Sequence, residues 1–176
     1  MNDGNSVHGP PMNEARINHG CATANYKGSD HVFVVGGDGP RGEVGYSTFD
    51  SLEVFNVNKG KWINAFRSAN LPVPLASLQV VEAKSPNYLV YAVGGLGFEG
   101  IVSTIYGLNY SKQWEKIGNL DIVRSSHATI NIKSDEIQGC QSKKLIKSFY
   151  TQWNNIKIRL RIVFIPNKIF FKLKQQ

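Results

Sequence analysis

The chain is poor in cysteine and has no long apolar run. Its 176 residues include two cysteines, Cys21 and Cys140, so it holds neither a disulfide framework nor the CxxC or HExxH spacing of a metal site. No apolar run approaches the roughly 18 residues that a membrane-spanning helix needs. The polar start, MNDGNSVHGPPMNE, lacks the basic and apolar regions of a signal peptide. These absences favour a cytoplasmic protein in which Cys21 is a small buried residue and not a nucleophile.

Net positive charge is missing from the first part of the chain, and glycine is scarce in the last. Residues 1–134 contain 11 Lys and Arg against 11 Asp and Glu, whereas residues 135–176 contain 9 basic and 2 acidic residues. The net charge of +7 therefore comes from the tail. Of the 17 glycines, only Gly139 follows residue 134. We expect two parts of different character, and a nucleic-acid or membrane partner is disfavoured because only the tail is basic.

What the first part does contain is a repeat of about fifty residues. Two double glycines are 58 positions apart, and Trp62 and Trp114 are 52 positions apart. Aligning MNEARINHGCATAN with LDIVRSSHATINI adds an Arg-x-x-His marker, which occurs once ahead of the first glycine pair and once after the second. The aligned positions are Arg16 with Arg124 and His19 with His127, with Pro74 and Ser77 in the same slots between them. Each unit thus has one order of markers. It starts with the segment that holds the Arg-x-x-His marker or its counterpart, which we call the lead-in, and continues with an apolar run, a double glycine, a second apolar run and a tryptophan.

The segments between these markers have the patterns of strands. HVFVV and YLVYAV are short, rich in β-branched and aromatic residues, and end at glycine. SLEVFNV and STIYGLN follow them, and each leads through a polar turn to a tryptophan-bearing segment, KWINAF or QWEKIG. Gly, Pro, Ser and Asn interrupt every window long enough for a helix. The sequence therefore predicts an all-β fold with four strands in each unit.

The glycines also spell the G-x-G-x-x-G of a dinucleotide-binding loop twice, at Gly37, Gly39 and Gly42 and again at Gly95, Gly97 and Gly100. Such a loop must be followed by a helix whose N-terminal amides hold the pyrophosphate. Strand-like segments follow both clusters here, and Pro40 lies inside the first. We therefore predict that the glycines serve close backbone approach and positive φ angles, and that they bind no nucleotide.

In their recurring order, these markers resemble the kelch repeat, in which each unit forms one four-stranded antiparallel blade of a β-propeller. The resemblance implies an incomplete propeller whose aromatic and tryptophan residues are mostly buried between adjacent blades. It implies that His19 and His127 are hydrogen-bonded at strand starts and are not metal ligands. The residues that carry the match are Gly36, Gly37, Phe55, Trp62, Gly94, Gly95, Tyr106 and Trp114.

The repeat predicts the domain boundaries. A disordered N-terminus covers residues 1–11 and the kelch repeats cover 12–133, followed by a basic tail, rich in Ile, Lys and Asn, at 134–176. Within the repeats, blade 1 is expected at about 12–66, blade 2 at about 74–118 and the first strand of blade 3 at about 124–132. A third double glycine is due near position 144, where Lys143-Lys144 stands. Because propellers close with about four to eight blades, we expect a fragment of a longer protein, or a truncated or read-through product.

The tail leaves three interpretations open. In IKIRLRIVF, apolar and basic residues alternate, which suits a strand with one apolar and one positive face. It is a substitute strand over an open blade edge, an ill-ordered extension prone to aggregation, or a site for an anionic partner.

For function, the resemblance implies a non-catalytic protein–protein interaction module that binds through its propeller loops. The candidate contact residues are Arg41 and Glu43 in the first loop after a double glycine, and Phe98 and Glu99 in the second. No catalytic residue, metal, cofactor or small-molecule substrate is expected. The expected partner is a protein, with self-association through open blade edges as a further option. The alternatives are a fragment of a kelch-propeller enzyme of the galactose oxidase type, or a product without function.

Overall fold

The computed structural model describes residues 9–40, 45–130, 148–153, 156–165 and 168–175. The chain divides into two compact units, residues 1–127 and 128–176, and each is described by itself. Regular structure in the described ranges is β, apart from a short 3-10 turn at Asn64–Phe66, so the predicted all-β class is confirmed. No helix within these ranges has the length and apolar character needed to cross a membrane.

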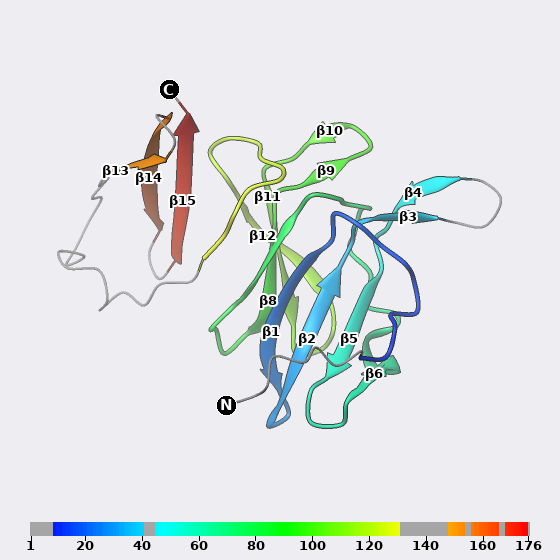
Figure 1. The fold of residues 1–176 in the computed structure, drawn as a ribbon. Helices are drawn as coiled ribbons and strands as arrows, with labels where there is room; N and C mark the ends of the chain where they lie inside the picture. The colour runs from blue at the N-terminus through cyan, green and yellow to red at the C-terminus, as the bar shows by residue number, and fades with distance from the viewer. Residues whose placement is uncertain (1–8, 41–44, 131–147, 154–155, 166–167, 176) are drawn as a thin grey trace, which may run out of the picture. The chain divides into compact units, whose positions relative to one another are not determined.

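The first unit begins with a four-stranded antiparallel sheet (Figure 1). Its strands, in spatial order, are β1 (Gly20–Tyr26), β2 (Ser29–Val35), β5 (Leu52–Asn56) and β6 (Lys61–Ile63). β1 and β2 are joined by Lys27 and Gly28, whose φ angles are +53° and +76°. Two consecutive positive φ angles match the right-handed twist of hairpin strands, so this two-residue loop closes the sheet locally.

A second sheet repeats the same order. Its strands are β7 (Gln79–Glu82), β8 (Tyr88–Val93), β11 (Thr104–Asn109) and β12 (Trp114–Asn119). All neighbouring pairs are antiparallel, and β11 carries irregularities in its pairing with both neighbours. The six strand segments expected from the sequence all lie in these two sheets, so two four-stranded antiparallel sheets are confirmed.

The core of the first unit lies between the two sheets. Side chains alternate along a strand, so Phe33 and Val35 share one face of the first sheet with Leu52 and Val54. From the second sheet, Val80, Val90, Ala92 and Leu108 join the same cluster of buried residues. Strands β1 and β7 of the two sheets approach closely. A Cβ added to Gly20 in β1 would lie only 2.5 Å from Val80 Cγ2 in β7. Apolar burial on facing sheets therefore holds the two repeats together.

The four aromatic marker residues are all partly buried. Tyr106 and Trp114 pack against the shared core, and Trp114 Nε1 donates a hydrogen bond of 2.8 Å to the Ala69 carbonyl in the connection between the sheets. Phe55 and Trp62 form an edge-to-face pair with ring centroids 5.3 Å apart. Trp62 Nε1 donates to the Pro10 carbonyl at 3.0 Å. Trp114 thus connects the second sheet to the segment that follows the first sheet. Trp62 contacts the segment before β1.

Because Trp114 and Trp62 lie in different environments, we expect their substitution by phenylalanine to lower the free energy of unfolding by different amounts. Trp114→Phe removes a partly buried indole hydrogen bond and leaves the Ala69 carbonyl without it, so we expect a loss of about 1–2 kcal/mol in the free energy of unfolding. Trp62→Phe removes an exposed hydrogen bond and is expected to cost less than about 1 kcal/mol. Urea denaturation of both variants, followed by circular dichroism, measures the difference. Equal losses would contradict the distinct roles.

The structure corrects two alignments between the repeats. Ile17 bridges Asp38 and Ala76 bridges Leu96, so Leu75 and Leu78 occupy the lead-in slots of Arg16 and His19. The sequence alignment placed Pro74 and Ser77 there, one residue too early, because it had only the Arg and His as guides. Phe55 is likewise equivalent to Leu108, since the two are paired with Val32 and Val90. The slot of Tyr106 in the first sheet is filled by Glu53.

Beyond the second sheet, residues 124–130 form turns and irregular backbone. The first strand expected at about 124–132 reaches into residues outside the described part, so it stays a prediction. The second unit contains a three-stranded antiparallel sheet in the order β13 (Ser148–Trp153), β14 (Ile156–Ile165) and β15 (Lys168–Gln175). The strand predicted from IKIRLRIVF is therefore confirmed as β14, while the role of the tail stays a prediction.

Candidate partner-binding surface

Both double glycines turn the chain out of its sheet. Gly36 and Gly37 have φ angles of +63° and +94°, and Gly94 and Gly95 have +59° and +115°, a region that favours glycine. Each pair ends the second strand of a sheet and leads into a two-stranded hairpin. No helix leaves either pair, so the structure supports the backbone role of these glycines and excludes the dinucleotide-binding geometry.

The first hairpin consists of β3 (Asp38–Pro40) and β4 (Tyr46–Thr48). Its base is fixed to the lead-in of the first sheet, because Ile17 and Asp38 exchange two backbone hydrogen bonds of 2.8 Å. The Asp38 carboxylate accepts further bonds from Thr48 Oγ1 at 2.8 Å and Asn18 Nδ2 at 3.2 Å. Tyr46 is 70% exposed on this anchored hairpin.

The second hairpin consists of β9 (Leu96–Gly97) and β10 (Gly100–Ile101). Ala76 and Leu96 exchange backbone hydrogen bonds of 2.9 and 2.7 Å, so this base is anchored as the first one is. Phe98 at the tip is fully exposed, and Leu96 and Ile101 on either side of it are 44% and 47% exposed. Three apolar side chains thus face solvent on one short, supported hairpin.

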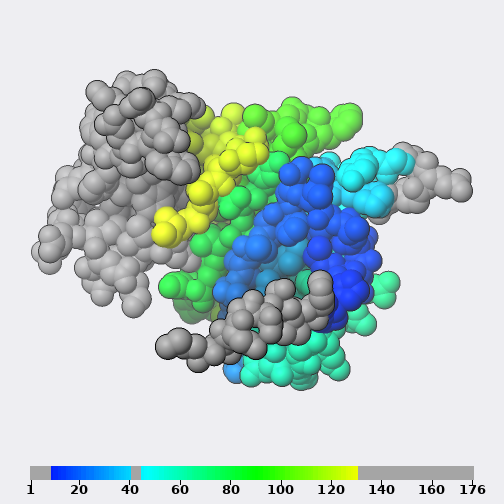
Figure 2. All heavy atoms as spheres, viewed as in Figure 1, coloured from blue at the N-terminus to red at the C-terminus, as the bar shows by residue number. Residues whose placement is uncertain are grey.

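The two hairpins lie beyond the same end of the two sheets (Figure 1). In the space-filling view, the green hairpin β9–β10 and the cyan hairpin β3–β4 stand out from the body of the first unit (Figure 2). Exposed apolar side chains on a rigid scaffold are the usual composition of protein-binding sites. We define the hairpin surface as the exposed apolar residues of the two hairpins and of the adjoining lead-in: Ile17, Tyr46, Leu96, Phe98 and Ile101.

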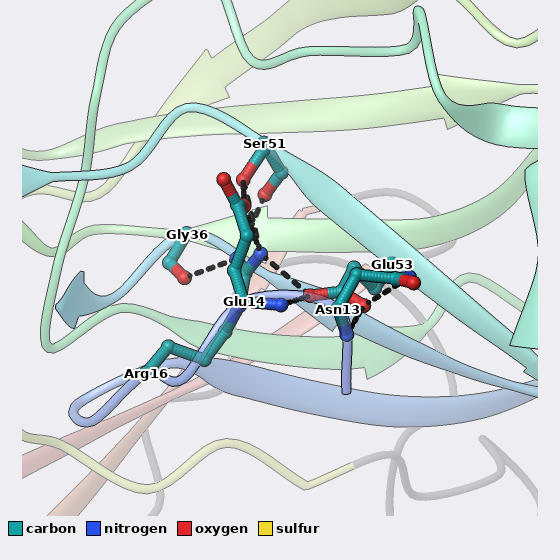
Figure 3. A network of polar contacts seen from close by, with 6 residues as sticks. All are labelled: Asn13, Glu14, Arg16, Gly36, Ser51 and Glu53. Atoms are coloured by element: carbon teal, nitrogen blue, oxygen red, sulfur yellow. Dashed lines mark hydrogen bonds and ion pairs between the residues drawn. The ribbon is translucent and has the colours of Figure 1, made fainter. Parts of the chain in front are cut away.

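A buried arginine fixes the base of the first hairpin (Figure 3). The Arg16 side chain is 0% exposed, and its Nη1 donates to the carbonyls of Gly36 at 2.8 Å and Ser51 at 3.3 Å. Nη2 donates to the carboxylates of Glu14 at 2.7 Å and Glu53 at 2.9 Å. The guanidinium therefore connects the lead-in, the glycine turn that starts the hairpin and the start of β5.

Glu53 is the buried acceptor of this network. Its carboxylate accepts hydrogen bonds from the backbone N–H groups of Asn13 and Glu14, at 2.7 and 3.1 Å, and from Asn13 Nδ2 at 2.8 Å. Burial by itself raises the pKa of Glu53, but these hydrogen bonds and the Arg16 charge together bring the pKa below its usual value. The Arg16–Glu53 pair is thus a structural ion pair in which the carboxylate and both Nη groups are hydrogen-bonded, while Arg16 Nε has no partner among the described residues.

The predicted contact residues fall in two groups. Phe98 and Glu99 are exposed at the tip of the second hairpin. Arg41 and Glu43 lie outside the described residues. Sequence reasoning missed Tyr46, Leu96 and Ile101, although apolar residues flanking a glycine-containing turn were a usable signal. It also missed Glu53 as the partner of Arg16, for which the signal was a carboxylate within the apolar pattern SLEVFNV.

His127 and the first cysteine differ from their expected environments. The expected hydrogen bond is absent at His127, where neither ring nitrogen has a partner among the described residues, whereas His19 is hydrogen-bonded to the Arg16 backbone and leaves Nδ1 without a partner. Cys21 is exposed and not buried, because it lies on the face of β1 that points away from the shared core. Within the described residues, no three His, Cys, Asp or Glu side chains are grouped closely enough to hold a metal ion.

Comparison with known proteins adds no relative to these observations. No protein-family model matches the chain, and no curated protein sequence matches it.

Proposed function

We propose that this chain is part of a kelch-type β-propeller and acts as a non-catalytic protein-binding module through its hairpin surface. The observation that carries the proposal is that the same arrangement of sheet, double glycine and hairpin occurs twice. Two four-stranded sheets of the same order each end their second strand in a double glycine, and each projects an anchored hairpin from the same end. A repeated scaffold that presents exposed apolar hairpin residues suits recognition of a protein partner.

A binding function also accounts for the residues that first suggest chemistry. The double glycines contact the lead-in turns, since a Cβ on Gly36 would lie 2.2 Å from the Leu75 carbonyl and one on Gly94 would lie 2.5 Å from the Arg124 carbonyl. Trp114 packs against the shared core. Because these groups are engaged in packing, we propose that binding occurs without catalysis or a cofactor, in preference to a fragment of a propeller enzyme.

Phe98 provides the test of this proposal. Phe98→Ala removes a fully exposed side chain, so the free energy of unfolding is expected to change by less than about 0.5 kcal/mol. Binding to a partner is expected to weaken by roughly tenfold or more, because exposed aromatic anchors often dominate interfaces. A photo-crosslinking amino acid placed at position 98 of the full chain identifies the partner. The affinity of that purified partner for wild type and Phe98→Ala is then measured by titration calorimetry.

Tyr110 supplies the matched control. It is 46% exposed in the turn between β11 and β12, away from the hairpins. The crosslinker at position 110 is expected to give no adduct with the partner, and Tyr110→Ala is expected to bind as wild type does. Equal crosslinking at both positions, or an unchanged affinity of Phe98→Ala, would contradict binding through the hairpin surface.

A further inference from the structure

Residues 124–127 are attached to the second sheet as residues 75–78 are attached to the first. The Gly95 N–H donates to the Arg124 carbonyl at 2.7 Å, as the Gly37 N–H donates to the Leu75 carbonyl at 2.9 Å. The remaining bonds also correspond in pairs. They are Arg124 N–H to Val102 O at 3.1 Å with Leu75 N–H to Phe49 O at 3.2 Å, and Ser126 N–H to Ser77 O at 2.8 Å with Ser77 N–H to Asn18 O at 2.7 Å. We call residues 124–127 the third lead-in.

The same side-chain slot holds an apolar residue in one lead-in and a histidine in the next. A Cβ added to Gly36 would lie 3.1 Å from Leu78 Cδ2, and one added to Gly94 would lie 3.0 Å from His127 Cε1. Leu78 is almost fully buried in the shared core. The imidazole of His127 therefore occupies the slot that holds a buried aliphatic side chain in the second lead-in. Both of its nitrogens are buried and have no hydrogen-bond partner among the described residues.

The surroundings of His127 disfavour the charged imidazolium. Desolvation by burial lowers the pKa of His127, and the positive charge of Arg124 on the same lead-in lowers it further. From the second sheet the contacting residue is Gly94, which carries no charge. The neighbouring second lead-in contributes Ser77, which is likewise uncharged, through its backbone bond to Ser126. No carboxylate acts on the imidazole to offset these effects among the groups that shift its pKa.

We propose that His127 is a pH-sensitive latch that keeps the third lead-in docked on the second sheet while its imidazole is neutral and releases it on protonation. The direction of the pH dependence follows from the linkage between protonation of His127 and docking of the third lead-in. Because the docked imidazole has the lower pKa, docking is at full strength above the ordinary histidine value of about 6.5 and weakens as the pH falls below it. The weakening amounts to about tenfold per pH unit for one proton, until the docked form itself is protonated.

Hydrogen exchange at the Gly95 amide tests the latch, because this N–H donates across the docked contact. Exchange of the full chain is followed by NMR from pH 7.5 to 5.0 and corrected for the intrinsic rate at each pH. In wild type, the protection of Gly95 is expected to fall by up to about tenfold per unit below pH 6.5. In His127→Leu, which places in the slot the residue found at position 78, the protection is expected to stay constant.

His19→Leu is the matched control, because His19 occupies the equivalent slot of the first lead-in, and this variant is expected to retain the pH dependence at Gly95. In the His127→Leu background, the Gly37 amide, which donates to the Leu75 carbonyl in the equivalent contact of the second lead-in, reports any wider loss of structure and is expected to stay protected. The imidazole titration of His127 in wild type gives a second measurement that needs no variant at that position. Constant protection of wild-type Gly95, an equal loss in His127→Leu, or titration of His127 at or above pH 6.5 would each overturn the proposal.

Discussion

Gly36→Ala is expected to lower the free energy of unfolding by about 3 kcal/mol or more. Two costs combine at this position. The φ angle of +63° is strained for any residue with a Cβ, and that Cβ would lie 2.2 Å from the Leu75 carbonyl oxygen. Because this carbonyl accepts the Gly37 hydrogen bond that docks the second lead-in, the backbone cannot move away without breaking the contact between the sheets. Urea denaturation of the full chain, followed by tryptophan fluorescence, measures the loss.

Gly60→Ala separates the two costs. Gly60 has nearly the same φ angle, +61°, but no atom lies within 4 Å of a Cβ built there. Only the backbone cost of about 1 kcal/mol is expected for this variant. If Gly36→Ala were no less stable than Gly60→Ala, close packing between the repeats would not be the role of the double glycine.

The second large effect is expected at the buried ion pair. Glu53→Ala leaves the Arg16 guanidinium in a buried site without its buried counter-ion and also removes the acceptor for Asn13 and Glu14. Breaking one side of a buried pair typically costs about 3–5 kcal/mol, and we expect a loss of that size. Glu14→Gln is the control, because the Glu14 side chain is 44% exposed and its contribution is expected to stay below about 1 kcal/mol.

The second repeat suggests a rescue of Glu53→Ala. There the slots of Arg16 and Glu53 hold Leu75 and Tyr106, an uncharged combination in the same type of sheet. The double variant Arg16→Leu, Glu53→Tyr is therefore expected to be more stable than Glu53→Ala, because no buried charge is left unpaired. A double variant less stable than Glu53→Ala would show that Arg16 acts mainly through its bonds to backbone carbonyls.

The dependence of stability on acidic pH gives an independent test of the role of the Glu53 carboxylate. Since its pKa is lower in the folded protein than in the unfolded chain, its contribution is complete above about pH 4.5 and is lost as the pH falls through the folded-state pKa. Stability of wild type should therefore decline more steeply below this pH than stability of Glu53→Ala. Parallel declines in urea denaturation at pH 3–6 would contradict the assigned role of the carboxylate.

The strands and their order could be predicted from the sequence for local reasons. Alternating apolar residues, polar turns and double glycines act over a few positions, so segments such as HVFVV and YLVYAV identify β2 and β8 directly. The spacing of Trp62 and Trp114 added the repeat. The alignment of the lead-ins was wrong by one residue at Leu75 and Leu78. With leucine in place of Arg and His, the second lead-in has no residue in common with the first that could fix the alignment.

The sequence by itself determined the all-β class, the two four-stranded units and the glycine turns, because these depend on side-chain period and on backbone angles. Only the tertiary structure decided what the repeated slots do. Arg16 meets Glu53 across 37 positions, and His127 meets Gly94 across the contact between successive repeats. The environment of a side chain is set by neighbours from other strands. One lead-in position therefore holds Arg16 in an ion pair in the first unit and the uncharged Leu75 in the second, and another holds the buried Leu78 in one lead-in and the unpaired imidazole of His127 in the next.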